Sequence, residues 1–275
     1  MDIPQKLYKY ESFNTYSIAN LKNQKIYFSN PITFNDPFDC AIGCSFENIS
    51  QSDFTSIYDY YLNKDPSKFS KSMKLAVKTK LDANMESELL DLFTGLLKKA
   101  FLNSRNKILN SRGISCFSET SNEILMWSHY ANKHQGFCLE FDTRFDPFNR
   151  AMNVNYSHQV PHINPVEVIL KPDSNQFLKM VTNKYKSWEY EKEWRVLHME
   201  GSIEYGYPEM SLTGIYFGSK INYAHLEIIA LIVQGQNPDV KFYQGSISEE
   251  KYKINFNEVS YTSYVQAKKM EWYNN

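Results

Sequence analysis

The sequence predicts an α+β fold: a mixed, largely antiparallel β-sheet body that carries a helical insertion near residues 50–110. Aromatic residues make up 15% of the 275 residues, and Tyr and Phe favour strands. Short apolar segments bounded by turn residues recur before and after the insertion. Within it, leucines recur at helical spacing, and polar residues fill the opposite side. No repeat or low-complexity linker is visible, so we expect a single enlarged domain over residues 1–275.

The composition sets limits on location and partners. The net charge is −1, which argues against a generally basic nucleic-acid surface but leaves room for a local basic groove. No apolar run approaches the length that crosses a bilayer, and the first residues lack the apolar core of a signal peptide. We therefore expect a cytoplasmic protein with no membrane partner.

Before the insertion the sequence predicts two strands and one helix. Residues 6–10 and 25–29 are short and rich in aromatic or β-branched side chains, which is typical of strands. A helix is expected between them at residues 15–21. Residues 30–39 contain two prolines together with Asn and Asp, which predicts a turn-rich loop.

After the insertion, strands and helices alternate. Strands are expected at 113–118, 136–142, 154–157, 166–170, 194–199, 214–218, 228–234, 240–243 and 252–256. Helices are expected at 122–133, 174–186 and around 223–228. The first of these has Ser121 or Asn122 as its cap and Glu123 in its first turn. Gly136 is placed to end it in a left-handed conformation.

The segment Trp188–Arg195 (WEYEKEWR) is the most informative stretch for function. It places three carboxylates, a guanidinium and two indoles within eight residues. An extended segment would put Glu189, Glu191, Glu193 and Arg195 on one face. A helical segment would instead pair Glu189 with Glu193 and Glu191 with Arg195. Both geometries crowd carboxylates, which often marks a functional site. A solvated helix end with structural ion pairs is also compatible with this sequence.

Two other segments carry candidate binding groups. In the loop Phe34–Asp39 (FNDPFD), Asp36 or Asp39 could contact a ribose hydroxyl or a catalytic partner, or the loop could cap itself through side-chain hydrogen bonds. In Met126–Gly136, a helix would align Trp127, Tyr130 and His134, most simply as core. Ser128, His129 and Tyr130 together offer an acid–base or ribose-binding cluster.

Several chemistries find no support in the motifs. The sequence has no G-x-S-x-G elbow, P-loop, G-x-G-x-x-G or H-E-x-x-H. Cys40 and Cys44 lack the paired partners of a zinc site, so we expect no metal and reduced core cysteines. Glu191-Lys192-Glu193 resembles a metal-dependent nuclease site only weakly, because the usual order of acid, any residue and lysine is missing.

Three groups of segments together resemble a widespread bacterial family that is named only as a domain of unknown function. Its members are similar to some abortive-infection proteins of phage defence. The groups are LYKY (7–10) with FNDPFD (34–39); CFS (116–118) with MWSHY (126–130) and GFC (136–138); and WEYEKEWR (188–195). The resemblance covers nearly the whole chain outside the insertion, and it implies no particular chemistry.

A more distant similarity suggests ADP-ribosyltransferases, which carry an Arg or His, then a Tyr or Ser, then a late Glu. This chain has Lys9 or Tyr10, then Tyr27 or Ser29, then Glu191 or Glu193, and it departs from the pattern at the first position. Cleavage of a nicotinamide–ribose bond develops positive charge, which a carboxylate stabilises.

The leading hypothesis is an enzyme of bacterial defence that cleaves or transfers from a nucleotide, with NAD as the substrate and no metal. Glu191 and Glu193 would stabilise charge, and Arg195 would orient them or hold a phosphate. His129 would be a further catalytic group. Tyr10, Asp36, Tyr130 and Trp188 would bind the nucleotide, and a protein or nucleic acid could be the acceptor. A non-catalytic sensor or interaction module is the alternative, and a metal-dependent nuclease is third.

Overall fold

The computed structural model describes residues 2–45, 49–64, 66–68, 70–82, 87–170, 174–263 and 269. The chain divides into two compact units. The first comprises residues 1–34, 111–156 and 186–275, and the second comprises residues 35–110 and 157–185.

The first unit is built on an eight-stranded sheet in the order β14-β13-β12-β5-β1-β4-β10-β6. Among these described strands, β12 and β13 pair in parallel, and the other neighbouring pairs are antiparallel. The strands are β1 (Lys6–Glu11), β4 (Gly113–Ser118), β5 (Phe137–Asp142), β6 (Met152–Asn153), β10 (Glu193–His198), β12 (Leu212–Phe217), β13 (Lys241–Ile247) and β14 (Ile254–Val259).

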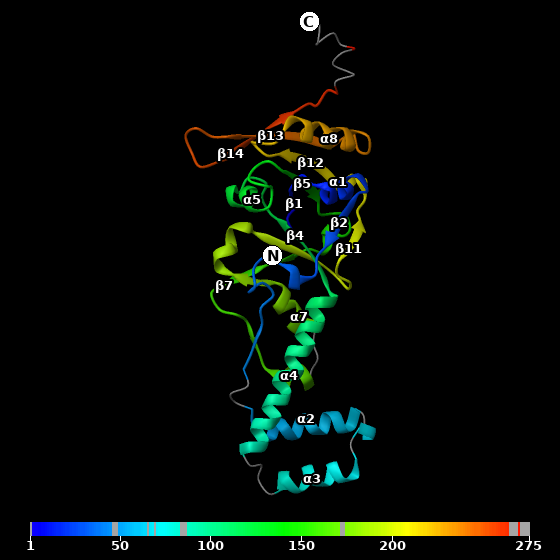
Figure 1. Cartoon of the computed structure of the whole chain (residues 1–275), viewed down its shortest axis with the longest axis vertical. Helices are drawn as coiled ribbons and strands as arrows, with labels where there is room; N and C mark the ends of the chain where they lie inside the picture. The colour runs from blue at the N-terminus through cyan, green and yellow to red at the C-terminus, as the bar shows by residue number, and fades with distance from the viewer. Residues whose placement is uncertain are drawn as a thin grey trace. The chain divides into compact units, whose positions relative to one another are not determined.

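One face of this sheet is apolar. Alternate residues along β5, namely Phe137, Leu139 and Phe141, join the main core because strand side chains alternate between faces. Helices α1 (Thr15–Lys22) and α8 (Tyr223–Gln234) contribute to the same core, as does β2 (Lys25–Phe28), which pairs with β11 (Ile203–Gly206). Figure 1 shows α8, in orange, beside β12 and β13, the parallel pair that it connects.

The two core helices begin at asparagine caps. The side chain of Asn14 accepts hydrogen bonds from the backbone N–H groups of Tyr16 and Ser17. Asn222 accepts one from Ala224 at the start of α8. Each cap satisfies backbone donors that the first helical turn leaves unpaired, so the helix start is fixed by the sequence.

The opposite face of the sheet is partly covered by α5 (Ile124–His129) and the turns after it. Trp127 and Ala131 are fully buried there against Tyr10 of β1, Cys138 of β5 and Ile254 of β14. Short 3-10 helices connect other parts of the first unit: η1 (Pro31–Thr33), η3 (Phe148–Arg150), η4 (Lys186–Glu191) and η5 (Glu209–Ser211). The strand β7 (Asn155–Ser157) leads from the first unit into the second.

The second unit contains the predicted helical insertion. Its helices are α2 (Gln51–Lys64), η2 (Pro66–Lys68), α3 (Lys71–Asp82), α4 (Ser87–Ser111), α6 (Pro165–Leu170) and α7 (Ser174–Val181). A parallel pair joins β3 (Gly43–Cys44) and β8 (His162–Ile163), and β9 (Asn183–Tyr185) ends the unit. Ile49, Ile57, Leu97 and Val166 form a small buried cluster.

The α+β prediction is confirmed, including the mostly antiparallel sheet and the helices at 50–110. The single enlarged domain stays a prediction, and segment 157–185 shares the compact unit of the helices. Three local expectations were wrong. Residues 228–234 belong to the helix α8 rather than to a strand, and 166–170 belong to α6. The expected helix at 174–186 ends at Val181 and is followed by β9.

The region around Gly136 also differs from its prediction. Helix α5 ends at His129 rather than 133, and the left-handed residues are Asn132, Lys133 and His134. No glycine among the described residues has a positive φ. Gly136 is instead required by close packing, because a side chain there would collide with the carbonyl oxygen of Glu11.

None of the described helices combines the length and the apolar character that a bilayer span needs.

Candidate functional site

A row of polar side chains crosses the face of the sheet opposite the main core. Glu193 of β10 is paired with Ser118 of β4, Ser118 with Tyr8 of β1, and Tyr8 with Glu140 of β5. Residues in register on neighbouring strands lie about 5 Å apart and point to the same face. The strand order therefore places two carboxylates from distant segments on one line.

Glu193 and Arg195 form a buried ion pair at one end of this row. Arg195 Nε lies 2.8 Å from Glu193 Oε1, and Arg195 Nη2 lies 3.0 Å from Oε2. Glu193 is 3% exposed and Arg195 is 0% exposed. The guanidinium also lies over the ring of Phe34, 5.6 Å from its centroid. The carboxylate accepts two hydrogen bonds from the guanidinium, and the Phe34 ring covers the guanidinium. A buried charge needs partners of this kind.

Glu191 points to a different partner. The hydroxyl of Tyr130 donates a hydrogen bond to Glu191 Oε1 at 2.6 Å, and Glu191 is 3% exposed. The Ser118 hydroxyl donates to the Glu191 carbonyl oxygen at 2.7 Å, which fixes the backbone there. Tyr130 follows α5 and Glu191 ends η4, so this bond ties the two elements together.

The segment 188–195 follows neither of the two regular geometries that the sequence allowed. Residues up to Glu191 are in the 3-10 helix η4, Lys192 has a φ of 44°, and β10 starts at Glu193. The left-handed Lys192 turns the chain between the two glutamates. Glu193 and Arg195 consequently share a strand face, whereas Glu189 pairs with Lys186 at 2.6 Å.

Three aromatic side chains gather beside the Tyr130–Glu191 hydrogen bond. His129 of α5 and Trp188 and Tyr190 of η4 have ring centroids 6.0–6.5 Å apart, and we call them the ring cluster. The ring of His129 also meets that of Tyr130 at 6.3 Å. His129 is exposed, and Trp188 and Tyr190 are half-buried. The ring cluster therefore presents aromatic surface to solvent next to a buried carboxylate.

Two expected binding residues have local structural partners. Tyr10 is buried, donates to the Thr120 carbonyl oxygen at 2.7 Å and meets Trp127 edge-on; burial raises its pKa. Asp36 lies in the second unit and accepts a hydrogen bond from the Phe38 N–H at 2.8 Å. This is the self-capping loop that the sequence also allowed.

The structure places the remaining residues of the ADP-ribosyltransferase-like order apart from the ring cluster. The Lys9 ammonium lies over the Phe117 ring, on the apolar side of the sheet. Tyr27 is 41% exposed on β2, opposite Glu204 of β11, and the Ser29 backbone bridges to Ile114.

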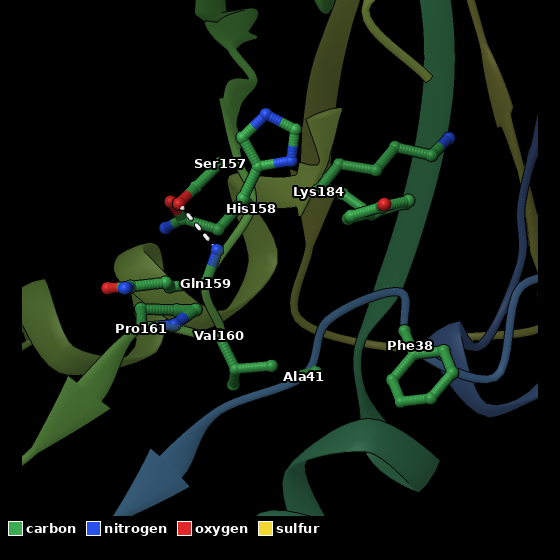
Figure 2. A pocket seen from close by; sticks show the side chains of 10 residues that line it. Phe38, Ala41, Ser157, His158, Gln159, Val160, Pro161 and Lys184 are labelled. Carbon is green, nitrogen blue, oxygen red and sulfur yellow. Dashed lines mark hydrogen bonds between the residues drawn. The ribbon is translucent and has the colours of Figure 1, made fainter. Parts of the chain in front are cut away.

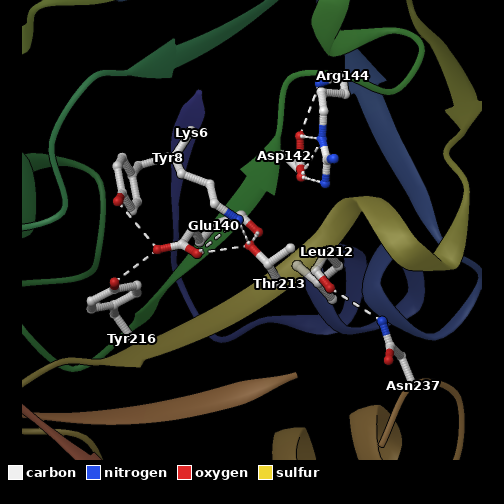
Figure 3. A network of polar contacts seen from close by, with 9 residues as sticks. All are labelled: Lys6, Tyr8, Glu140, Asp142, Arg144, Leu212, Thr213, Tyr216 and Asn237. Carbon is white, nitrogen blue, oxygen red and sulfur yellow. Dashed lines mark hydrogen bonds and ion pairs between the residues drawn. The ribbon is translucent and has the colours of Figure 1, made fainter. Parts of the chain in front are cut away.

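Sequence reasoning missed a second carboxylate centre on the sheet, at Glu140 (Figure 3). It accepts hydrogen bonds from Thr213 Oγ1 at 2.7 Å, Tyr216 Oη at 2.8 Å and Tyr8 Oη at 3.2 Å, and Lys6 Nζ lies 3.4 Å away. Burial by itself would raise the pKa of Glu140, but these donors and the Lys6 charge hold it below its ordinary value of 4.5. One signal was available: Glu140 is a charged residue between Leu139 and Phe141 in an apolar strand, and such a charge needs partners.

The Glu140 centre is a structural clamp more than an open site. Burial and the neighbouring carboxylate raise the pKa values of both Tyr8 and Tyr216, so both hydroxyls remain donors. The four donors come from β1 and β12, the strands on either side of β5. Glu140 therefore holds the three neighbouring strands β1, β5 and β12 together.

Among the residues with described positions, no group of three or more His, Cys, Asp or Glu side chains is arranged to hold a metal ion. The described cysteines Cys40, Cys44, Cys116 and Cys138 are not in disulfide bonds.

Comparisons with known proteins bear on one stretch of the chain. Residues 126–196 match the model of a family described as "Protein of unknown function (DUF2971)". Comparison with curated proteins and with solved structures finds no match. The matched stretch begins at α5 and ends within β10, so it contains the ring cluster, Tyr130, Glu191 and the Glu193–Arg195 pair.

Proposed function

We propose that this protein binds a nucleotide of the NAD type at the ring cluster and breaks its nicotinamide–ribose bond. One observation carries the proposal: aromatic rings from α5 and η4 lie beside the hydrogen bond between Tyr130 and the buried carboxylate of Glu191. Planar ligand groups stack on such rings, and a carboxylate favours positive charge that develops nearby.

The ring cluster suits the flat parts of a nucleotide. Trp188 and Tyr190 come from η4, and His129 comes from α5, so two elements set the spacing of the rings. Aromatic rings bury large area with little loss of conformational freedom, and offset or edge contacts each add about 0.5–1.5 kcal/mol. The nicotinamide or the adenine ring is the group we expect to lie there.

Tyr130 and Glu191 supply the polar part of the proposal. The Tyr130 hydroxyl donates its proton to Glu191, and a phenol oxygen can also accept a hydrogen bond, for which a ribose hydroxyl is a suitable donor. The C1′–N bond would break with its electron pair leaving on neutral nicotinamide. The Glu191 charge would stabilise the positive ribose carbon until water or an acceptor adds there and loses a proton.

Glu193 and Arg195 take a different role in this proposal from the one that the sequence suggested. Each satisfies the other inside the protein, so we assign them to holding β10 in place rather than to touching the nucleotide. This observation favours a second candidate function, a non-catalytic nucleotide sensor, because such a sensor needs the ring cluster but no reacting carboxylate.

One experiment distinguishes the two functions. Purified protein is titrated with NAD while Trp fluorescence is followed, and free nicotinamide is measured in the same samples. We expect binding and release in the wild type, binding without release in Glu191→Gln, and neither in Trp188→Ala. Tyr252→Ala, which removes a fully exposed ring on the same unit, is the matched control.

Each outcome is decisive for one function. Saturable binding without nicotinamide release in the wild type supports the sensor and ends the enzyme proposal. Absence of binding to NAD, ADP-ribose and AMP rejects both. Release that Glu191→Gln leaves unchanged removes Glu191 from the chemistry. Adding candidate protein or nucleic-acid acceptors to the active sample tests transfer, and growth of bacteria expressing wild type or Glu191→Gln tests the defence role.

A further inference from the structure

The second unit contains a cavity with a volume of 310 Å³ that lies wholly within it. Its walls come from the loop before β3, the segment 157–161 and the strand β9. Figure 2 shows Phe38 and Ala41 on one side and His158, Val160 and Pro161 on another. The volume falls at the lower end of the roughly 300–1,000 Å³ that small-molecule pockets occupy.

The FNDPFD loop is shaped to present Phe38 at this cavity. Asp36 Oδ1 accepts from the Phe38 N–H at 2.8 Å, and the Asp36 carbonyl accepts from the Asp39 N–H at 3.0 Å. The Phe38 carbonyl in turn accepts from the Ala41 N–H at 3.1 Å, with Cys40 at a φ of 53°. These turns direct the Phe38 side chain outward, where it is 66% exposed.

A buried ion pair fastens the same loop to β9. Lys184 Nζ lies 3.6 Å from Asp39 Oδ2, and the two side chains are 6% and 3% exposed. Because the two charges face each other, this wall of the cavity carries no net charge. Phe38 precedes Asp39 in the loop, and Tyr185 follows Lys184 in β9. The ion pair therefore holds together the two segments that carry these cavity-lining rings.

The cavity exposes apolar and aromatic surface that water solvates poorly. Phe38, Val160 and Tyr185 are 66%, 37% and 47% exposed, and the ring of His158 meets that of Tyr185 edge-on at 6.0 Å. Such surface gathered in a hollow, rather than scattered singly, is typical of a binding site.

We propose that this cavity is a second binding site, which takes a neutral, planar aromatic small molecule between Phe38 and the His158–Tyr185 rings. The rings favour a flat aromatic group, since aromatic pairs prefer offset or edge contacts. Gln159 and Asn183 add uncharged amides that can form hydrogen bonds, Ser157 adds a hydroxyl, and His158 adds an imidazole. A charged ligand would lose its hydration without meeting a free counter-charge, because Lys184 is already paired with Asp39.

The test compares nicotinamide with nicotinate, which have the same ring and nearly the same size but differ by one negative charge at pH 7. Binding is measured by saturation-transfer NMR on the full chain carrying Trp188→Ala, which disables the ring cluster of the first unit. We expect nicotinamide to bind, and nicotinate to bind at least about tenfold more weakly, a ratio that corresponds to about 1.4 kcal/mol.

Variants locate the site. Phe38→Ala removes one aromatic wall, and Val160→Trp fills the hollow; both residues are exposed, so folding is preserved and is checked by thermal melting. Each should weaken nicotinamide binding about tenfold or more, whereas Tyr252→Ala should leave it unchanged. Because the Trp188→Ala background is common to all samples, failure here leaves the proposed NAD site untouched.

Three results would overturn the second site. The first is no nicotinamide binding in the Trp188→Ala background. The second is binding that Phe38→Ala and Val160→Trp do not change. The third is nicotinate binding as tightly as nicotinamide, which would show that the cavity does not favour a neutral ring over a charged one.

Discussion

Arg195 meets the carboxylate of Glu193 through two hydrogen bonds, Nε to Oε1 at 2.8 Å and Nη2 to Oε2 at 3.0 Å, with both side chains buried. The pair is possible because residues two apart on a strand point to the same face. Both side chains lie on the face opposite the main core, at the end of the polar row that runs toward Glu140.

Removing one member of this pair should destabilise the protein more than removing both. We expect Glu193→Gln and Arg195→Met each to lower the free energy of unfolding by about 3–5 kcal/mol, because each leaves a buried polar partner poorly satisfied. The double change Glu193→Leu with Arg195→Met should recover a large part of this loss. Urea unfolding of the four proteins measures it, and a double variant as unstable as the sum of the singles would contradict the pairing.

Glu140 should stabilise the fold in a pH-dependent way. Its pKa is held below 4.5 in the folded state, so its contribution is present above that value and is lost as the pH falls through the folded pKa. We expect the difference in stability between wild type and Glu140→Gln to be large at pH 7 and to shrink below pH 4.5. Glu258→Gln, an exposed carboxylate on β14, is the control. An equal difference at every pH would argue against the assigned charge.

His134 should lower the stability of the protein as the pH falls, because the folded state holds its ring neutral. Burial lowers its pKa below 6.5, and the nearby Lys220 charge lowers it further. The folded state therefore resists protonation, and stability should decline as the pH falls from 6.5 toward the folded pKa. His134→Asn, which tolerates the local φ of 69°, should reduce this decline. NMR titration of the His134 ring protons would reveal a pKa above 6.5 if this is wrong.

Gly136 should not accept a side chain. A methyl group there would collide with the Glu11 carbonyl oxygen and come within 2.9 Å of that of Ala131. We expect Gly136→Ala to lower the melting temperature strongly, because backbone must move on two sides. Gly206→Ala is the matched control, since its nearest neighbour would be 3.9 Å away. Similar melting temperatures for the two variants would show that the segment is loosely packed.

The strand pattern could be predicted because it depends on local composition. Residues 6–10 and 113–118 carry dense aromatic or β-branched side chains, and both are strands. The segment 228–234 misled us for the same reason: it is a short apolar run with three isoleucines and a valine, and periodicity alone does not separate a buried strand from a buried helix. The helix expected around 223–228 instead continues through Gln234 from its cap at Asn222.

The candidate site was only partly accessible to sequence reasoning. Glu191, Glu193, Arg195, His129, Tyr130 and Trp188 could be named because chemically active residues crowd two short segments. Their hydrogen-bond partners could not be predicted, because Lys192 turns the chain between Glu191 and Glu193. A positive φ at Lys192 cannot be predicted from its being a lysine. The link from Tyr8 to Glu140 to Tyr216 depends on strand order, which joins residues more than seventy positions apart.

The position of β1 in the sheet has a consequence for synthesis on the ribosome. Its neighbours are β4, which begins at Gly113, and β5, which ends at Asp142. At about 5–20 residues per second, β1 waits several seconds after its synthesis for the first of these partners. During that interval the backbone N–H and C=O groups of β1 can pair with strands of other nascent chains. The yield of folded protein therefore depends on how well these six residues are protected until β4 and β5 are made.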